Sequence, residues 1–284
     1  MKQKTSSNTK ELSNRKEKQL EELLRHRYAH RGLHQKPVIP ENSMAAFRRA
    51  VEAGYGIELD LHLTRDGKLA VIHDSSLKRT CGVDQNVEDM TMEEAQSCFL
   101  EESREQIPEF TEVLQLVAGR VPLIVELKAG KTQDGTDTTA ALCRTAASAL
   151  DDYAAAYGEK TENHGGKPGL VPALYCVESF SPVAVKWLRV NRPDVIRGQL
   201  AANINREKKT LTCTQNFLLK NLLVNLSGKP DFVAYNFDDR HEPALQRYDG
   251  PLFFWTIRSY ADLKEAEALG AAGIFEQFDP KKYE

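Results

Sequence analysis

The stretch GIELDLHLTRDGKLAVIHD, residues 56–74, holds two apolar segments whose separation is too short for a helix. Its Asp66-Gly67 pair is typical of a two-residue β-hairpin turn, so we expect the two segments to form antiparallel strands. Counting back from such a turn sets Asp60 opposite His73, about 5 Å apart at Cβ. A longer turn would shift this register by one residue.

Short apolar segments separated by helical patterns recur along the rest of the chain. This alternation indicates repeated strand–helix units and therefore a mostly parallel sheet or barrel of the α/β class. The 284 residues are close to the length of a single α/β barrel, which is roughly 250 residues. The predicted strands begin at residues 28, 56, 69, 123, 173, 195, 231, 252 and 272.

The best-marked helix follows the first predicted strand. Either Asn42 or Ser43 is its N-cap, Gly54 is its C-terminal stop, and apolar residues repeat between them at helical spacing. Glu41 directly precedes these candidates. It either caps the helix or supports a functional site.

Three segments lie outside the repeating pattern. Residues 1–26 are strongly charged, with leucines at the spacing of a short amphipathic helix, and we predict a helical lead-in to one domain, 27–284. Residues 75–108 are polar and weakly periodic, while residues 151–169 are Gly-rich and charged and are predicted to form a loop. Neither of these two resembles an independent domain.

The composition disfavours several classes of protein. Basic and acidic residues nearly balance, at 38 and 41, so we expect no nucleic-acid partner. No apolar stretch is long enough to span a membrane, and the basic N-terminus lacks the apolar core of a signal peptide. The 5 cysteines are scattered, which favours reduced thiols and a cytoplasmic location over disulfides or structural zinc. Nothing in the sequence indicates the oligomeric state.

Several predicted strands end in ionisable residues. Glu58 and Asp60 are two apart, as are Glu126 and Lys128, so each pair points to one side of its strand. A charge buried in a strand costs several kcal/mol unless it is paired or binds a metal. We therefore predict that the three carboxylates converge at one rim and hold a cation. Oxygen ligands without thiolates favour Mg²⁺ or Ca²⁺ over zinc.

Further residues at these strand ends suit phosphate chemistry. Arg31 can hold a phosphate through paired hydrogen bonds and Lys128 as a point charge. His30 and His73 would supply a general base and a general acid near neutral pH. Singly, each is more often structural, and the combination on four segments favours a functional site. Trp255 near a later strand end either lies in the core or lines the pocket. The other histidines, predicted to be solvated, are His26, His34, His62, His164 and His241.

The motifs AHRG, PENS, ELDLHLTRDGKLAVIHD, IPEFTEVL and VELK, in this order, resemble the glycerophosphodiester phosphodiesterases of the phosphatidylinositol-phospholipase-C-like barrel superfamily. Later segments, VESFSP, PDFVAYNF and FFWTI, extend the resemblance from residue 28 to about residue 278. It implies a TIM-type (β/α)8 barrel, with the Asp-Gly hairpin after the second strand and residues 75–108 as an inserted segment.

The resemblance also implies a reaction. A small-molecule glycerophosphodiester would be split into sn-glycerol 3-phosphate and an alcohol, with the neighbouring glycerol hydroxyl attacking phosphorus to give a cyclic intermediate. The alcohol, the choice between Mg²⁺ and Ca²⁺, and the division of acid and base roles between the histidines stay open. The matching residues are His30 and His73 for catalysis, Arg31 and Lys128 for phosphate, and Glu58, Asp60 and Glu126 for the cation.

Two motifs depart from the family pattern. Family members commonly continue the tryptophan strand as WTVN and finish with TD-x-P, where this chain has WTIRS and FEQFDP. Arg258 and Glu276 therefore change the charges near the rim, which affects the expected alcohol preference more than the phosphodiester chemistry. Two alternatives remain. One is a lysophospholipase D-like or sphingomyelinase D-like enzyme of the same superfamily, and the other is a catalytically silent barrel that binds phosphorylated ligands.

Overall fold

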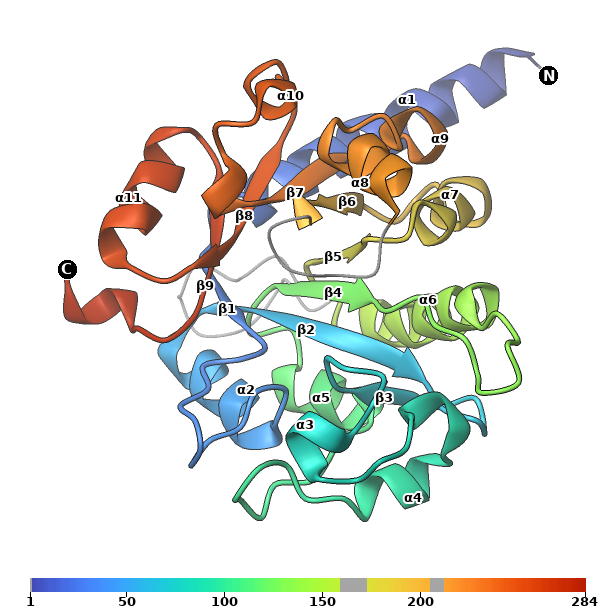
Figure 1. Cartoon of the computed structure of the whole chain (residues 1–284). Helices are drawn as coiled ribbons and strands as arrows, with labels where there is room; N and C mark the ends of the chain where they lie inside the picture. Colours follow the sequence, from blue (N-terminus) through green and yellow to red (C-terminus); the bar gives the residue numbers. More distant parts are fainter. Residues whose placement is uncertain (1, 159–172, 205–211) are drawn as a thin grey trace.

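Eight parallel strands close into a barrel in the part of the chain that the computed structural model describes, residues 2–158, 173–204 and 212–284. The hydrogen-bonded order runs β1-β9-β8-β7-β6-β5-β4-β2, and β1 pairs with β2 to close the ring (Figure 1). The expected TIM-type barrel is confirmed. Its strands are β1 (Tyr28–His30), β2 (Gly56–Leu63), β4 (Leu123–Leu127), β5 (Tyr175–Ser179), β6 (Arg197–Ala201), β7 (Phe232–Asn236), β8 (Leu252–Ile257) and β9 (Ala272–Phe275).

The ninth strand, β3 (Leu69–Val71), is antiparallel to β2, which confirms the predicted hairpin. Its predicted register is wrong by one residue, because the Ile72 amide donates to the Asp60 carbonyl, so Ile72 and not His73 lies opposite Asp60. The cause is the turn. The Thr64 amide donates to the Lys68 carbonyl, which leaves a three-residue loop between them. The last loop residue is Gly67, whose φ is 77°. This is the hairpin with an αL bulge residue, not the two-residue turn.

Helices surround the barrel and cover the outward-facing side of its strands (Figure 1). Ile57, Leu59 and Leu61 of β2 pack there with helix residues such as Phe47 and Leu142. Because strand residues alternate, Glu58 and Asp60 face the barrel interior. The helices are α1 (Lys2–Leu23), α2 (Met44–Ala53), α3 (Lys78–Cys81), α4 (Met92–Gln96), α5 (Phe110–Val117), α6 (Thr139–Tyr157), α7 (Pro182–Asn191), α8 (Cys213–Lys220), α9 (Asn225–Gly228), α10 (Pro243–Gln246) and α11 (Tyr260–Ala268).

Helix α2 begins and ends as the sequence indicates. Of the two candidate N-caps, Ser43 has the role, because its hydroxyl accepts a hydrogen bond from the Ala46 amide at 3.1 Å. Gly54 ends the helix with a left-handed backbone, φ 73°. The other candidate, Asn42, does not cap the helix and belongs to the site described below.

Helix α1 closes the N-terminal end of the barrel. Leu20 and Leu23 are buried in the barrel interior with residues from the beginnings of the strands, among them Tyr28 and Phe232. The Lys16 ammonium donates to Asp231, just before β7, at 2.7 Å. The segment predicted as a lead-in therefore supplies part of the core.

The two segments that looked inserted differ. Residues 75–108 carry α3, the short 3-10 helix η1 (Val87–Asp89) and α4, and their apolar side chains form a small second core with Ala70 and Ile72 of the hairpin. The predicted loop 151–169 is wrong in its first part, because helix α6 continues to Tyr157. Residues 159–169, including His164, lie outside the described residues.

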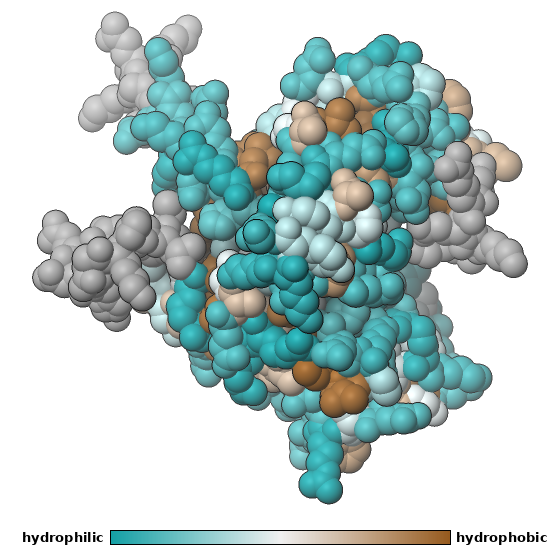
Figure 2. All heavy atoms as spheres, turned by 90° about the vertical axis from the view of Figure 1, so that its left-hand side faces the viewer, coloured by the Kyte–Doolittle hydropathy of each residue, from teal (hydrophilic) through white to brown (hydrophobic). Residues whose placement is uncertain are grey.

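The surface seen from the side of α11 is mostly hydrophilic, with small separate hydrophobic areas (Figure 2). Within the described ranges, none of the helices combines the length and the apolar composition that crossing a bilayer requires.

Candidate active site

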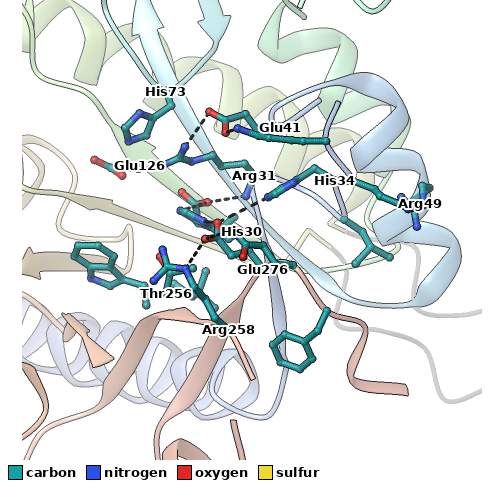
Figure 3. A pocket seen from close by; sticks show the side chains of 18 of the residues that line it. His30, Arg31, His34, Glu41, Arg49, His73, Glu126, Thr256, Arg258 and Glu276 are labelled. Atoms are coloured by element: carbon teal, nitrogen blue, oxygen red, sulfur yellow. Dashed lines mark hydrogen bonds and ion pairs between the residues drawn. The ribbon is translucent and has the colours of Figure 1, made fainter. Parts of the chain in front are cut away.

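A cavity of about 740 Å³ opens where the strands end, and the predicted site residues gather around it (Figure 3). Asp60, which is fully buried, lies beneath the cavity and contacts Lys128 in its wall. The predicted residues that line the cavity itself are His30, Arg31, Glu41, Glu58, His73, Glu126, Lys128 and Trp255.

Three carboxylates form a compact buried group. One oxygen from each of Glu58, Asp60 and Glu126 lies within 4.8 Å of the others. Burial and the negative charges of Asp60 and Glu126 raise the pKa of Glu58 well above its usual range. A divalent cation would relieve this crowding, and an all-carboxylate donor set suits a hard ion. These residues therefore fit a metal site.

Two cations flank the carboxylate group. Lys128 Nζ lies 2.8 Å from Asp60 Oδ1 and 2.7 Å from Glu126 Oε2. Arg31 Nε lies 3.4 Å from Asp60 Oδ2. Burial alone would raise the pKa of Asp60, but Lys128, His73 and Arg31 outweigh it and hold this pKa well below its usual range. Asp60 is therefore ionised and paired.

The turn after β1 directs Arg31 toward this group. Arg31 and Gly32 both have left-handed backbones, with φ of 55° and 79°. A Cβ on Gly32 would lie 2.9 Å from Ala46 of α2, so only glycine fits there. The turn aims the Arg31 amide at Glu58 Oε2, which accepts its hydrogen bond at 3.0 Å.

His30 is held between two carboxylates. Its Nδ1 lies 2.8 Å from Glu276 Oε2, and its Nε2 lies 3.8 Å from Glu58 Oε2. Burial and the charge of Arg31 lower the pKa of His30 to about 4, so the ring is neutral at pH 7. Nδ1–H then donates to Glu276, and Nε2 faces the carboxylate group.

Glu276 is a site residue that sequence reasoning treated only as a changed charge near the rim. It follows β9 directly and also accepts a hydrogen bond from Arg258 Nε at 2.9 Å (Figure 3). Burial would raise its pKa, but His30, His34 and Arg258 together hold the pKa of Glu276 far below its usual value. His34 lines the same cavity, and its side chain is only 7% exposed, so its prediction as a solvated residue was wrong.

His73 is supported by a different chain of contacts. Its Nδ1 lies 2.6 Å from Asp74 Oδ1, and Asp74 pairs with Arg79. Arg79 Nη2 in turn donates to Glu41 Oε1 at 2.6 Å, and Arg31 Nη1 donates to the same oxygen at 2.9 Å. Glu41 therefore supports the site and does not cap α2.

His62 was also predicted to be solvated, and that prediction was wrong. It is 4% exposed, with Nδ1 2.7 Å from Glu88 Oε1 and Nε2 3.1 Å from the His73 carbonyl. Ser75 Oγ donates to the other Glu88 oxygen at 2.6 Å. His26 is half-buried, and His241 is exposed as expected.

Two more residues were missed by sequence reasoning. Asn42 Nδ2 donates to Asp60 Oδ2 at 2.8 Å, with its backbone in the left-handed region at φ 54°. Glu178 on β5 is the register partner of Glu126 and lines the cavity. A signal for Glu178 existed, because it ends an apolar strand as Glu126 does.

Part of the cavity wall is apolar. Trp255 lines it, which answers the open question about this residue, and packs edge-on against Phe180 with ring centroids 5.5 Å apart. Its indole N–H donates to the Ala234 carbonyl at 3.2 Å. Leu200 and Ile274 line the same wall.

Comparison with known proteins gives one family. The model of the Glycerophosphoryl diester phosphodiesterase family matches residues 30–278. A glycerophosphodiester phosphodiesterase of Bacillus altitudinis is 44% identical over 108 residues, which cover 36% of this chain and 43% of that protein. The match thus spans less than half of that relative. Lysophospholipase D GDPD1 of Homo sapiens is 24% identical over 270 residues, 85% of this chain and 80% of that protein.

Solved structures share the fold. A phosphodiesterase from Oleispira antarctica, solved in complex with the product sn-glycerol-3-phosphate, superposes with a TM-score of 0.65 at 18% identity, covering 91% of this chain and 95% of that one. A protein from Agrobacterium tumefaciens, described as a putative glycerophosphoryl diester phosphodiesterase, superposes with a TM-score of 0.67 at 15% identity. The superposition covers 88% of this chain and 92% of that one.

Proposed function

The chain belongs to the glycerophosphoryl diester phosphodiesterase family, and on this premise we propose that it hydrolyses glycerophosphodiesters to sn-glycerol 3-phosphate and an alcohol. The observation that carries the proposal is the convergence of two histidines on one cavity, His30 and His73, beside a buried group of three carboxylates. Residues with separate structural roles at the ends of their strands would have no reason to converge on one cavity.

The reaction divides into two displacements at phosphorus. The glycerol hydroxyl next to the phosphoester attacks, the bond between phosphorus and the alcohol oxygen breaks, and a cyclic phosphate forms. Water then opens the ring to sn-glycerol 3-phosphate. One of His30 and His73 takes the proton of the attacking hydroxyl, and the other protonates the departing alkoxide. The two rings are held by different carboxylates, Glu276 and Asp74.

Charge on the phosphoryl oxygens is met by positive groups around the carboxylates. A divalent cation, Mg²⁺ or Ca²⁺, held by Glu58, Asp60 and Glu126 would supply Lewis-acid stabilisation of that charge. Arg31 and Lys128 lie beside the same carboxylates and would hold and orient the phosphate.

The location is part of the proposal. The cysteines are all free thiols, namely Cys81, Cys98, Cys143, Cys176 and Cys213. Free thiols persist in a reducing compartment, and we place the protein in the cytoplasm on this ground. Fractionation of cells that express it would test the location, and recovery outside the cytoplasm would contradict it.

A substrate survey tests the activity. The purified chain of 284 residues would be freed of metal with a chelator, and sn-glycerol 3-phosphate release would be measured with Mg²⁺ or Ca²⁺ restored. The substrates for this assay would be glycerophosphocholine, glycerophosphoethanolamine and glycerophosphoglycerol. Choline release would be measured for lysophosphatidylcholine, because its hydrolysis leaves the acyl chain on the glycerol phosphate. We expect release from at least one glycerophosphodiester, only with metal.

Other outcomes would favour the alternatives. Preferential release of choline from lysophosphatidylcholine would indicate a lysophospholipase D-like enzyme, the activity named for the human relative. Phosphate binding without turnover of any substrate would indicate a catalytically silent barrel.

A further inference from the structure

Glu178 is a buried carboxyl that the proposed mechanism leaves without a role. It lies on β5, is 1% exposed, and lines the cavity. Among the described residues, its Oε2 is a buried atom without a hydrogen-bond partner. Buried polar groups are nearly always hydrogen-bonded, and those that are not usually serve a ligand or a strained site.

The backbone register fixes where this carboxyl lies. Asp60, Glu126 and Glu178 are successive register partners on the adjacent strands β2, β4 and β5. Neighbouring strands are about 4.8 Å apart. The group that fits a cation comprises Glu58, Asp60 and Glu126. Glu178 therefore lies one strand beyond the cation group, at the same height in the barrel.

Among the described residues, those below Glu178 in the barrel interior are apolar. Cys176, two residues earlier on the same side of β5, is packed in the apolar barrel interior with Leu174 and Leu200. Leu200 also forms part of the cavity wall, beside Phe180. A partner for the Glu178 carboxyl must therefore come from the cavity, which is where the substrate would bind.

The geometry favours a hydroxyl as that partner. The buried Glu178 Oε2 atom needs a hydrogen-bond donor, because a carboxyl oxygen accepts such a bond and this one has none. A neutral substrate hydroxyl can supply that donor. In a glycerophosphodiester the glycerol hydroxyl next to the phosphoester is the nucleophile, so the terminal hydroxyl is left to be recognised, one carbon further from phosphorus.

We propose that Glu178 binds the terminal glycerol hydroxyl and thereby selects glycerophosphodiesters whose glycerol carries no acyl chain. This inference rests on the proposed function, because phosphorus is taken to lie beside the carboxylate group. An acyl chain on the terminal oxygen would remove its hydrogen and leave the Glu178 carboxyl incompletely paired. It would also add bulk against the apolar wall. Lysophospholipids are therefore poor substrates.

An analogue without the terminal hydroxyl tests this assignment. The phosphocholine diester of propane-1,2-diol, with phosphate on the primary oxygen, keeps the nucleophilic hydroxyl and lacks only the terminal one. We expect the wild-type kcat/KM for glycerophosphocholine to exceed that for the analogue by about 10- to 100-fold, because the analogue leaves a buried carboxyl unpaired.

Two variants connect the preference to Glu178. Glu178→Gln keeps a donor and an acceptor and should retain most of the preference, whereas Glu178→Leu should bring the ratio close to one. Glu178→Gln is nearly isosteric, so it remains informative if Glu178→Leu does not fold. Thermal unfolding of both variants would establish that they fold.

The outcomes separate this inference from the proposed function. Wild-type hydrolysis of both diesters at equal kcat/KM, or an unchanged ratio in folded Glu178→Leu, would overturn the role of Glu178 alone. Hydrolysis of neither diester with either metal would overturn the proposed function and this inference with it. A change of preference between choline and ethanolamine alcohols, with the hydroxyl preference unchanged, would also overturn the assignment, because Glu178 would then bind the other end of the substrate.

Discussion

His30 Nδ1 lies 2.8 Å from Glu276 Oε2, an interaction that joins the end of the first barrel strand to the end of the last one. The same carboxylate accepts a hydrogen bond from Arg258. Both Arg258 and Glu276 stand where the motifs depart from the family pattern. These two residues therefore form one hydrogen-bonded arrangement with His30.

Removing the Glu276 charge should slow turnover. A glutamine amide can donate to Nδ1, which would place the ring proton on Nε2, so we expect Glu276→Gln to lower kcat by about 100-fold with little change in KM. Glu276→Asp should recover part of the loss. Steady-state kinetics on glycerophosphocholine would measure both. Glu265→Gln, a change at an exposed carboxyl paired with Arg240, is the matched control.

Loss of the His62 side chain should displace His73. The His73 carbonyl accepts a hydrogen bond from His62 Nε2. Strand β3 ends at Val71, so within the described hairpin no strand partner bonds to this carbonyl and the His62 side chain holds it instead. We expect His62→Leu to lower kcat about 10- to 100-fold with KM nearly unchanged. His62→Gln should restore much of the rate, since its amide can donate. His241→Leu, at an exposed histidine, is the control. Wild-type kcat in folded His62→Leu would refute the positioning role.

Glu41 should stabilise the fold in a pH-dependent way. Burial raises its pKa, but Arg31, Arg79 and Lys36 overcome this and lower the pKa of Glu41 from 4.5 to about 2. A lowered carboxyl pKa stabilises the folded state fully above the unfolded value and loses that effect as pH falls toward the folded value. Glu41→Gln should therefore lower the free energy of unfolding by about 3 kcal/mol at pH 7 and by much less near pH 2.5.

Urea unfolding at several pH values would measure this difference. Glu93→Gln, at an exposed carboxyl, should change the free energy of unfolding little at any pH. A Glu41→Gln difference that is constant or grows on acidification would show that the three cations do not hold the carboxylate ionised.

Helix α1 should contribute to global stability through its leucines. Leu23 is fully buried in the barrel interior, whereas Leu226 is 78% exposed. Leu23→Ala should lower the free energy of unfolding by about 3 kcal/mol. Leu226→Ala should change it by less than about 0.5 kcal/mol. Equal effects of the two substitutions in urea unfolding would indicate that α1 does not pack on the barrel in solution.

Much of the fold follows from local patterns in the sequence. The apolar segments were enough to predict the strands, and the Asp66-Gly67 pair was enough to predict the hairpin, because strand burial and turn chemistry depend on local sequence. The hairpin register was wrong because the turn length depends on how Thr64 and Lys68 pair, which a dipeptide does not determine.

The candidate site was predictable where both partners end strands. Glu58, Asp60 and Glu126 met as expected, since the ends of parallel strands meet at one rim. The role of His62 was missed, although it shares a side of β2 with Asp60, because its partner Glu88 comes from the inserted segment. Contacts between distant segments depend on tertiary packing and leave no periodic signal.

One measurement tests the central claim most directly, the release of sn-glycerol 3-phosphate from glycerophosphocholine by the wild type and by His30→Ala and His73→Ala. Circular dichroism, the unfolding midpoint and bound metal would be measured on the same samples. We predict that each variant folds as the wild type does and releases product at least about 100-fold more slowly. Wild-type turnover by either folded variant would contradict the assignment of His30 and His73 as the acid and base of this site.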